Sequence, residues 1–365
     1  MNFRKYFLAL GIVAVSALPL ACGSDDSSPT VSDDDPNPPA ETFIRAADIS
    51  FLPEIESENT VYYNNGAAQD ALTTLKSSGV NCIRIRLWKD PANAHSGFQE
   101  VKTLAQRVRN AGLKVWLTVH YSDTWADPGN QQIPSAWSGF SFDQLKSAAV
   151  DYTGQILSEI NPDIIQIGNE TNDGLLWPSG KLSTNETQSV QLFSAISQKI
   201  RTQSPNTKIM LHYAGVSGAD WFFSKTASVD FDYIGLSYYP VWHGTTLTPL
   251  QNLVNSLGAT YNKKVIIAET AYPFTLGWND WTNNIVGQDN QLVSGYPATP
   301  QGQKDFLLAI RNIVETSPHG LGFAYWGGEW LAFRGTQATN GSTFENQALW
   351  DFDHNALPVL DAFHE

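Results

Sequence analysis

The stretch that decides the fold of this chain is Ile164-Ile165-Gln166-Ile167-Gly168-Asn169-Glu170, an apolar run that ends in a carboxylate. A second stretch of the same kind, Val265-Ile266-Ile267-Ala268-Glu269-Thr270, follows later in the chain. Short apolar runs rich in β-branched residues are typical of strands that are buried on both faces of a parallel sheet. Each run places a glutamate at the carboxyl end of its strand. We therefore expect Glu170 and Glu269 to face each other across a cleft.

Short apolar segments alternate with longer amphipathic segments on both sides of these two runs. The expected strands are residues 43–50, 81–88, 114–120, 163–168, 208–213, 233–239, 264–269 and 321–326. The expected helices are residues 67–78, 99–111, 142–160, 190–202, 247–261 and 302–316, with the weakest pattern at 220–228. Repeated strand–helix alternation predicts a parallel sheet, and eight units predict closure into an α/β fold, the (β/α)8 TIM barrel. Because no linker interrupts the pattern, we expect a single catalytic domain over residues 43–365.

The composition limits the partners of this domain. The net charge of −14 argues against nucleic acid and against an anionic membrane surface, and it favours a neutral or weakly charged substrate. The 12 tryptophans are numerous, and aromatic rings exposed in clefts are suited to stacking on sugar rings. We expect a monomer that binds a polysaccharide.

The N-terminus has the pattern of a processing segment. Two basic residues, Arg4 and Lys5, precede an apolar run over residues 7–15, and residues 16–22 resemble a bacterial lipoprotein cleavage site. We expect residues 1–21 to be a lipoprotein signal peptide, Cys22 to carry the lipid and residues 22–42 to be a flexible acidic tether. An ordinary secretory signal is the alternative. The expected location is the bacterial outer membrane, lipid-anchored at the cell surface. The second cysteine, Cys82, lies in a strand pattern and is expected to be buried without a disulfide.

The two glutamates are the candidate catalytic groups. A pair of acids at the ends of core strands is the arrangement that a barrel-type glycosidase needs. The acid that protonates a glycosidic oxygen needs a pKa raised toward neutrality, by burial or by a second carboxylate. The alternative is that Glu170 and Glu269 are bound by backbone amides of the loops that follow them. Their occurrence as a pair favours catalysis, and Asn169 is a candidate ligand for the sugar hydroxyl beside the reacting carbon.

Two arginines lie on one face of the second expected strand. Arg84 and Arg86 alternate with Ile83, Ile85 and Leu87, so both are expected to point into the barrel, where a cation needs a partner. Arg86 lies nearer the carboxyl end of the strand. We therefore expect Arg86 to hold the Glu269 carboxylate ionised and Arg84 to form an ion pair lower in the barrel.

Polar and aromatic residues at the ends of the other strands are candidate sugar ligands. The Tyr239 hydroxyl is expected to support Glu269, Tyr238 is expected to pack on the opposite face, and Trp326 is expected to form the floor under the sugar. Long segments after four strands, residues 121–139, 171–186, 271–299 and 327–347, are expected to form the rim. The remaining candidate substrate-binding residues are Asp48, His120, Tyr121, Trp125, His212 and Trp330.

No cofactor is expected. The chain contains no phosphate-binding loop, dinucleotide fingerprint or zinc pattern. Residues 351–355 have acidic spacing that suits calcium, but the glycine and distal glutamate of an EF-hand loop are missing, so a turn is expected there. We expect no metal in the catalytic site.

Several motifs together resemble glycoside hydrolase family 53, the endo-β-1,4-galactanases of a large clan of retaining (β/α)8 glycosidases. They are residues 47–54, 120–128, 167–170, 236–240, 266–270 and 346–352, and the run Ser122-Asp123-Thr124-Trp125-Ala126-Asp127-Pro128 is the most family-specific. The resemblance implies that Glu170 is the acid/base, that Glu269 is the nucleophile and that the substrate is the β-1,4-galactan of pectin, also called type I arabinogalactan.

The same resemblance raises the question of calcium, which some bacterial members hold between the loops after strands seven and eight. Residues 278–284 are not an obvious cage, so a structural calcium is not expected here. In addition, Trp326 is followed by Gly327-Gly328-Glu329 where the family usually has Glu-Pro. The role of Glu329 therefore stays open.

Two alternative functions remain at this point. One is another enzyme of the same clan, such as a β-mannanase or a xylanase, from which only the loop after His120 distinguishes this chain. The other is a surface lipoprotein that binds glycan without cutting it. The presence of both Glu170 and Glu269 argues against the second alternative, because a binding protein needs neither acid.

Overall fold

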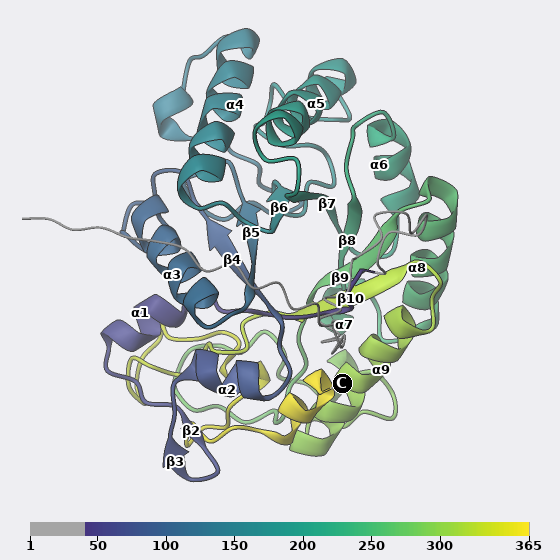
Figure 1. The fold of residues 1–365 in the computed structure, drawn as a ribbon. Helices are drawn as coiled ribbons and strands as arrows, with labels where there is room; N and C mark the ends of the chain where they lie inside the picture. Colours follow the sequence, from purple (N-terminus) through teal and green to yellow (C-terminus); the bar gives the residue numbers. More distant parts are fainter. Residues whose placement is uncertain (1–40, 365) are drawn as a thin grey trace, which may run out of the picture. The chain divides into compact units, whose positions relative to one another are not determined.

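Eight parallel strands close into a barrel in this computed structural model, which describes residues 41–364 (Figure 1). Each strand pairs with its neighbours in chain order, and the first strand pairs with both the second and the last. The predicted TIM barrel is therefore confirmed. The barrel strands are β1 Ile44–Asp48, β4 Cys82–Leu87, β5 Lys114–Val119, β6 Ile164–Ile167, β7 Lys208–Ala214, β8 Tyr233–Ser237, β9 Lys264–Thr270 and β10 Gly320–Tyr325.

Helices form the outer layer around these strands (Figure 1). Several begin at a side-chain cap, as α4 does at Ser141, where the capping box with Gln144 satisfies free backbone N–H groups. The helices are α1 Leu52–Ser57, α2 Ala71–Ser77, α3 Phe98–Asn110, α4 Phe142–Glu159, α5 Glu186–Gln203, α6 Ala219–Thr226, α7 Pro240–His243, α8 Thr248–Tyr261 and α9 Pro300–Glu315. Short 3-10 turns lie at Ser135–Trp137, Asp289–Gln291, Glu345–Gln347 and Pro358–Phe363.

One expected helix begins later than its pattern predicted. Residues 67 and 68 form the strand β3 Ala67–Ala68, which pairs with β2 Tyr63–Asn64, and α2 begins only after the cap at Asp70. Gly66 between the two short strands has φ +76°, which a hairpin turn requires and which a helix does not permit.

The barrel interior has two chemically different layers. The lower layer is an apolar cluster to which Trp116 and Tyr233 contribute the largest side chains, and Cys82 is buried in it as predicted. Above it, toward the carboxyl ends of the strands, the inward side chains become polar although they are still buried, namely Asp48, Arg84, Arg86, Thr118, Gln166, His212 and Ser237. Buried polar groups are costly unless they are paired, so this upper layer indicates a functional site.

The predicted signal peptide, the tether and the lipidated Cys22 lie outside the described residues. From Thr42 onward the described chain forms one compact unit. Within residues 41–364, every helix is too short or too polar to cross a membrane. The predicted turn at residues 351–355 is present, with the Asp351 carboxylate accepting hydrogen bonds from the backbone N–H groups of Asp353 and Asn355.

Candidate active site

Glu170 reaches the barrel mouth through an unusual backbone turn after β6. Gly168 has φ +77°, and a Cβ there would lie 2.3 Å from the Thr171 side chain, so only glycine fits. Glu170 itself has φ +47°, a left-handed conformation that is strained for a residue with a side chain. Its backbone N–H donates a hydrogen bond to His212 Nδ1 at 3.1 Å. Strain of this kind is concentrated at functional sites, where the surrounding structure holds it in place.

Glu269 reaches the same space because β9 is irregular. Ile266 and Ala268 belong to the apolar cluster inside the barrel, so strict alternation would turn Glu269 outward. The pairing of β9 with β8 shifts register between Leu236 and Ser237, and Ser237 pairs with Glu269. A bulge inserts an extra residue and redirects the next side chain. Glu269 therefore points inward, next to the end of β8.

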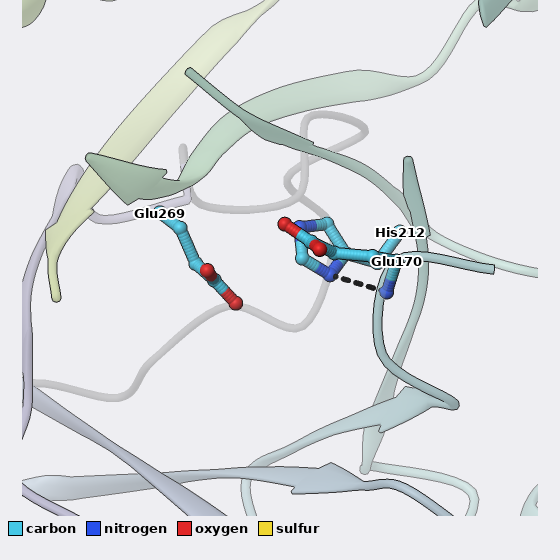
Figure 2. A group of neighbouring side chains, drawn as sticks. All are labelled: Glu170, His212 and Glu269. Carbon is cyan, nitrogen blue, oxygen red and sulfur yellow. Dashed lines mark hydrogen bonds between the residues drawn. The ribbon is translucent and has the colours of Figure 1, made fainter. Parts of the chain in front are cut away.

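The two glutamates approach each other closely. Figure 2 shows their carboxylates entering the same space, and an oxygen of each lies within 4.8 Å of the other and of a His212 ring nitrogen. A separation of about 5–5.5 Å between carboxyl groups is typical of retaining glycosidases, whereas inverting enzymes need about 6.5–9.5 Å for a water molecule. The separation here suits direct attack on a sugar carbon.

Glu269 is the carboxylate that is held by a cation. Arg84 Nη2 donates to Glu269 Oε1 at 2.6 Å, and the Tyr239 hydroxyl donates to Oε2 at 2.9 Å. Arg84 is itself anchored by Asp48 at 2.7 Å and donates to Asn169 Oδ1 at 3.0 Å. Burial raises the pKa of Glu269, while Arg84 and the Tyr239 hydroxyl act in the opposite direction. Because both contacts are donated to the ionised form, Glu269 is suited to be the nucleophile.

Glu170 has no cationic hydrogen-bond partner in the described part of the chain and is the better proton donor. Burial, together with the nearby charge of Glu269, raises the pKa of Glu170 to about 8. Its one side-chain hydrogen bond comes from the Ser237 hydroxyl, which donates to Oε1 at 2.6 Å. Glu170 is contacted by a neutral hydroxyl, whereas Glu269 is contacted by a guanidinium, and such a difference in environment is the usual basis for dividing acid and nucleophile roles.

The prediction that Arg86 holds Glu269 is wrong, because Arg84 does so. Arg86 instead lies between the rings of Phe51, Trp88 and Trp125, with its guanidinium carbon 4.2 to 4.5 Å from the ring centroids, and it donates to Ser96 Oγ. An arginine side chain is long enough to span a layer of the barrel, so the residue deeper on β4 reaches the carboxylate.

A cleft with a volume of about 420 Å³ lies over the two glutamates. Seven of the predicted substrate-binding residues line its wall: Arg86, His120, Trp125, Asn169, Tyr239, Trp326 and Trp330. Two others, Asp48 and His212, lie beneath it, where Asp48 holds Arg84 and His212 holds Glu170. The cleft is therefore polar at its base and aromatic along its walls, the combination that sugar binding requires.

Comparison with known proteins agrees with this geometry. The model of glycosyl hydrolase family 53 matches residues 44–363. This chain belongs to that family. It is 34% identical to an endo-beta-1,4-galactanase from Bacillus subtilis (strain 168), over 88% of this chain and 85% of that protein. It is also 34% identical to an arabinogalactan endo-beta-1,4-galactanase from Cellvibrio japonicus, over 87% of this chain and 89% of that protein. The structure of the GH53 catalytic domain of Ignisphaera aggregans superimposes with a TM-score of 0.83 at 38% identity, covering 88% of this chain and 95% of that one.

Tyr121 was predicted to bind the substrate, but in this family 53 chain it lies outside the cleft. Its φ of +51° turns the chain after β5, and its hydroxyl bonds to Thr153 Oγ1 on α4 at 2.7 Å. The ring is buried against Tyr152 and does not line the cleft. Tyr238 packs away from the cleft as predicted, with its hydroxyl donating to the Gly244 carbonyl oxygen.

Besides Arg84, the sequence pattern missed five residues of the cleft wall, which are Ala126, Asp127, Trp242, Thr343 and Phe344. Trp242 follows the end of β8 and is 56% exposed, so an aromatic residue close behind a strand end was an available signal. Thr343 and Phe344 lie in the long loop after β10, where no periodic pattern marks them. Glu329 lies in the same loop but does not line the cleft, and its carboxylate accepts the Phe51 N–H at 2.7 Å.

Among the described residues, Glu170, His212 and Glu269 are the one group of three His, Cys, Asp or Glu side chains that lie close enough together to share a metal ion (Figure 2). His212 is not free to bind a cation. Its Nδ1 accepts the Glu170 N–H, and its Nε2 contacts the Ser237 hydroxyl at 2.9 Å. Burial and the Arg84 charge also hold the pKa of His212 well below its usual value. The arrangement therefore suits a pair of acids with a supporting imidazole better than it suits a metal site.

A second group of buried oxygens lies between the loops after β9 and β10. Asp280 Oδ2, Asn284 Oδ1 and Glu345 Oε2 are buried without a hydrogen-bond partner among residues 41–364. Glu345 joins the two loops, because its Oε1 accepts the Asn279 N–H at 2.7 Å and the Asn284 amide at 3.5 Å. Burial raises the pKa of Glu345, and the Asp280 charge raises it further. Carboxylate and amide oxygens that lack donors fit a hard cation such as calcium.

Proposed function

We propose that this chain is an endo-acting galactanase that cleaves β-1,4-galactan, the side chain of pectin, with retention of configuration. The observation that carries the proposal is the pair of glutamates in one cleft of a family 53 chain, one held by Arg84 and the other with its pKa raised to about 8. The galactanase names of the Bacillus subtilis and Cellvibrio japonicus relatives support the choice of polysaccharide.

The mechanism follows from the contacts of each acid. Glu170 donates its proton to the glycosidic oxygen as the bond to the leaving sugar breaks. Glu269 attacks the anomeric carbon and forms a covalent glycosyl–enzyme intermediate, with Arg84 and Tyr239 holding it in line. Glu170, now ionised, takes a proton from water, which releases the sugar from Glu269. Asn169 lines the cleft beside both acids and would bind the neighbouring sugar hydroxyl.

A panel of polysaccharides tests the substrate. We expect reducing sugar to be released from β-1,4-galactan at least about 100-fold faster than from β-mannan, xylan or arabinan. A cleft whose polar groups match the hydroxyls of one sugar leaves some of those groups without a hydrogen-bond partner when a different sugar binds. The axial oxygen at C4 of galactose also bends the galactan chain, so an extended mannan or xylan chain follows a different path. Faster cleavage of mannan or xylan would favour the alternative enzyme of the same clan. No release from any of them would favour a glycan-binding protein.

Catalysis needs no cofactor in this mechanism, and we propose a structural role for calcium. Asp280, Asn284 and Glu345 would hold the ion, which would neutralise two buried acids and tie together the loops that carry Phe344 and Thr343 to the cleft. Its contribution would be to the stability of these loops, because these ligands are not among the residues that line the cleft.

Removal of the metal provides a test. We expect saturating calcium to raise the Tm of chelator-treated enzyme by about 4 °C, because an ion that binds only the folded state stabilises it. Asp280→Asn should abolish this shift, while Asp289→Asn, which changes an exposed acid of the same loop, should retain it. An equal calcium response in all three proteins, or none in the wild type, would contradict the proposal.

The cellular location and the oligomeric state of the enzyme are also proposals. We propose that Cys22 is lipidated, that residues 22–42 tether the enzyme to the bacterial outer membrane at the cell surface, and that it acts as a monomer. The acidic run after Cys22 and the lipoprotein-like N-terminal pattern support this placement. Mass spectrometry of the mature N-terminus tests it directly, since an unmodified residue other than Cys22 there would contradict it.

A further inference from the structure

A chain of three hydrogen bonds connects the backbone of Glu170 with its own carboxyl group. The Glu170 N–H bonds to His212 Nδ1 at 3.1 Å, His212 Nε2 lies 2.9 Å from Ser237 Oγ, and Ser237 Oγ lies 2.6 Å from Glu170 Oε1. His212 and Ser237 are completely buried and come from neighbouring strands, β7 and β8. The loop closes on a single residue, so each proton in it can be placed.

The direction of each bond follows from one donor whose identity is certain. A backbone N–H can only donate, so His212 Nδ1 must accept and carries no proton. The Gln166 amide, at 2.8 Å from the same nitrogen, reinforces this. A neutral imidazole then has its proton on Nε2, which donates to Ser237 Oγ. The Ser237 hydroxyl, having accepted, directs its own proton to Glu170 Oε1.

We propose that His212 and Ser237 act together as a positioning pair that confines the transferable proton of Glu170 to Oε2. This inference rests on the proposed role of Glu170 as the acid/base. Oε1 is occupied by a hydrogen bond that it accepts, so a proton on Oε1 would face the Ser237 proton. The proton is therefore held on the other oxygen. His212 also retains the left-handed backbone at Glu170, so the same imidazole sets where the carboxyl group is and which of its oxygens is the acid.

The pair lies among several other titratable or charged groups, so a pH profile has to be read with all of them in view. Glu269 on β9 and Arg84 on β4 both shift the pKa of Glu170, and Arg84 also shifts the pKa of His212. The others are Asp127 and His120 around the end of β5, Tyr239 after β8 and His243 in α7. A variant that changes only the hydrogen bond from Ser237 leaves all of these charges in place.

Ser237→Ala is that variant. The hydrogen bond from Ser237 stabilises the ionised form of Glu170, so its loss should raise the pKa of Glu170 further above about 8. Because Glu170 acts as an acid only when protonated, the alkaline limb of kcat/KM should move upward by about one pH unit. The acid limb, set by Glu269, should stay in place. At the optimum, kcat on galactan should fall about tenfold, because the proton is no longer held on one oxygen.

Matched variants separate positioning from folding. Ser237→Thr keeps the hydroxyl and should restore both the pH profile and most of kcat. Tyr238→Phe removes the adjacent hydroxyl, which points away from the cleft, and should leave the profile unchanged. An unshifted or lowered alkaline limb in a folded Ser237→Ala enzyme that still cleaves galactan would overturn the proposal. A wild-type enzyme that cleaves no galactan would instead overturn the proposed function.

A measurement on the unaltered protein tests the same proposal if Ser237→Ala does not fold. Nitrogen NMR of histidine-labelled enzyme, with the His212 signals identified by their loss in His212→Asn, reports which ring nitrogen carries the proton. We expect the neutral form with the proton on Nε2 from pH 5 to pH 9. A proton on Nδ1, or a charged ring at neutral pH, would require Ser237 to be oriented differently and would refute the inference.

Discussion

Replacing Glu269 with alanine should lower kcat on galactan by about ten-thousand-fold or more, the largest effect expected of any single change in this protein. The variant loses the atom that forms the covalent bond, and no neighbouring group can replace it. Tyr239 and Arg84, which hold Glu269, would be left with a cavity. Arg84 would keep its ion pair with Asp48 at 2.7 Å, so the protein should still fold. Steady-state rates with a matched unfolding curve for each protein would measure both effects.

The chemistry at Glu269 can be observed as well as removed. A galactoside activated at C1 and slowed by fluorine at C2 should accumulate as an ester on the wild-type enzyme, and mass spectrometry should find it on the peptide that carries Glu269. The first sugar product should be the β anomer, as double displacement requires. A label on another residue, release of the α anomer, or a near-normal rate in Glu269→Ala would each contradict the assignment.

The barrel could be predicted from the sequence because most of its strands are short segments rich in apolar residues. Such runs occur only where both faces are buried, and their alternation with helices leaves few topologies open. The strand containing residues 164–167 and the one containing 265–269 were found in this way, and the structure places them as β6 and β9. The exception is at residues 67–68, which were expected to be helical because alanine favours a helix. The adjacent Gly66 has a positive φ, which a helix does not permit.

The contacts within the site were harder to predict because they depend on departures from regular strand geometry. The alternation of inward and outward residues along the strand correctly predicts that Arg84 and Arg86 point inward, but it contains no information on how far each side chain reaches. The same alternation, applied strictly to β9, would place the Glu269 side chain outside the barrel, and the bulge in β9 brings it to the cleft. Tyr121 was misplaced for a related reason, since its positive φ turns its ring toward α4. The error at Tyr121 thus comes from a local distortion of the backbone, whereas the exchange of Arg84 and Arg86 comes from the length of the side chain.

The residues that were missed in the cleft wall have a different cause. Asp127 and Phe344 lie in long loops after β5 and β10, Trp242 lies in the short helix α7 after β8, and the closed barrel brings them to one mouth. A loop has no period from which a buried or exposed face can be read, so its contacts follow only from the complete fold. Glu170 and Glu269 were found because they lie at the ends of strands, where the sequence pattern still applies.

Replacing Glu170 should have an effect that depends on the leaving group, which distinguishes an acid from a nucleophile. On galactan, whose leaving sugar needs a proton, Glu170→Ala should lower kcat/KM by about a thousandfold. On an aryl galactoside with a good leaving group, the first step needs no acid and the loss should fall mainly on hydrolysis of the intermediate. The variant should also lose the alkaline limb of its pH profile, because burial raises the pKa of Glu170 to about 8 and this group is then absent.

Azide provides the complementary test, because the space vacated by the carboxyl group is open to the cleft. A small anion that enters it no longer meets the charge of Glu170, so it can attack the glycosyl–enzyme intermediate without base catalysis. Azide should therefore accelerate Glu170→Ala with the aryl substrate and yield the β-galactosyl azide, and it should not accelerate Glu269→Ala in the same way. Equal losses on both substrates without rescue would mean that Glu170 is not the acid/base. Since Ser237 and His212 are buried and bonded to one another, they should retain their positions in this variant. The loss would then belong to the missing carboxyl group and not to a collapse of its support.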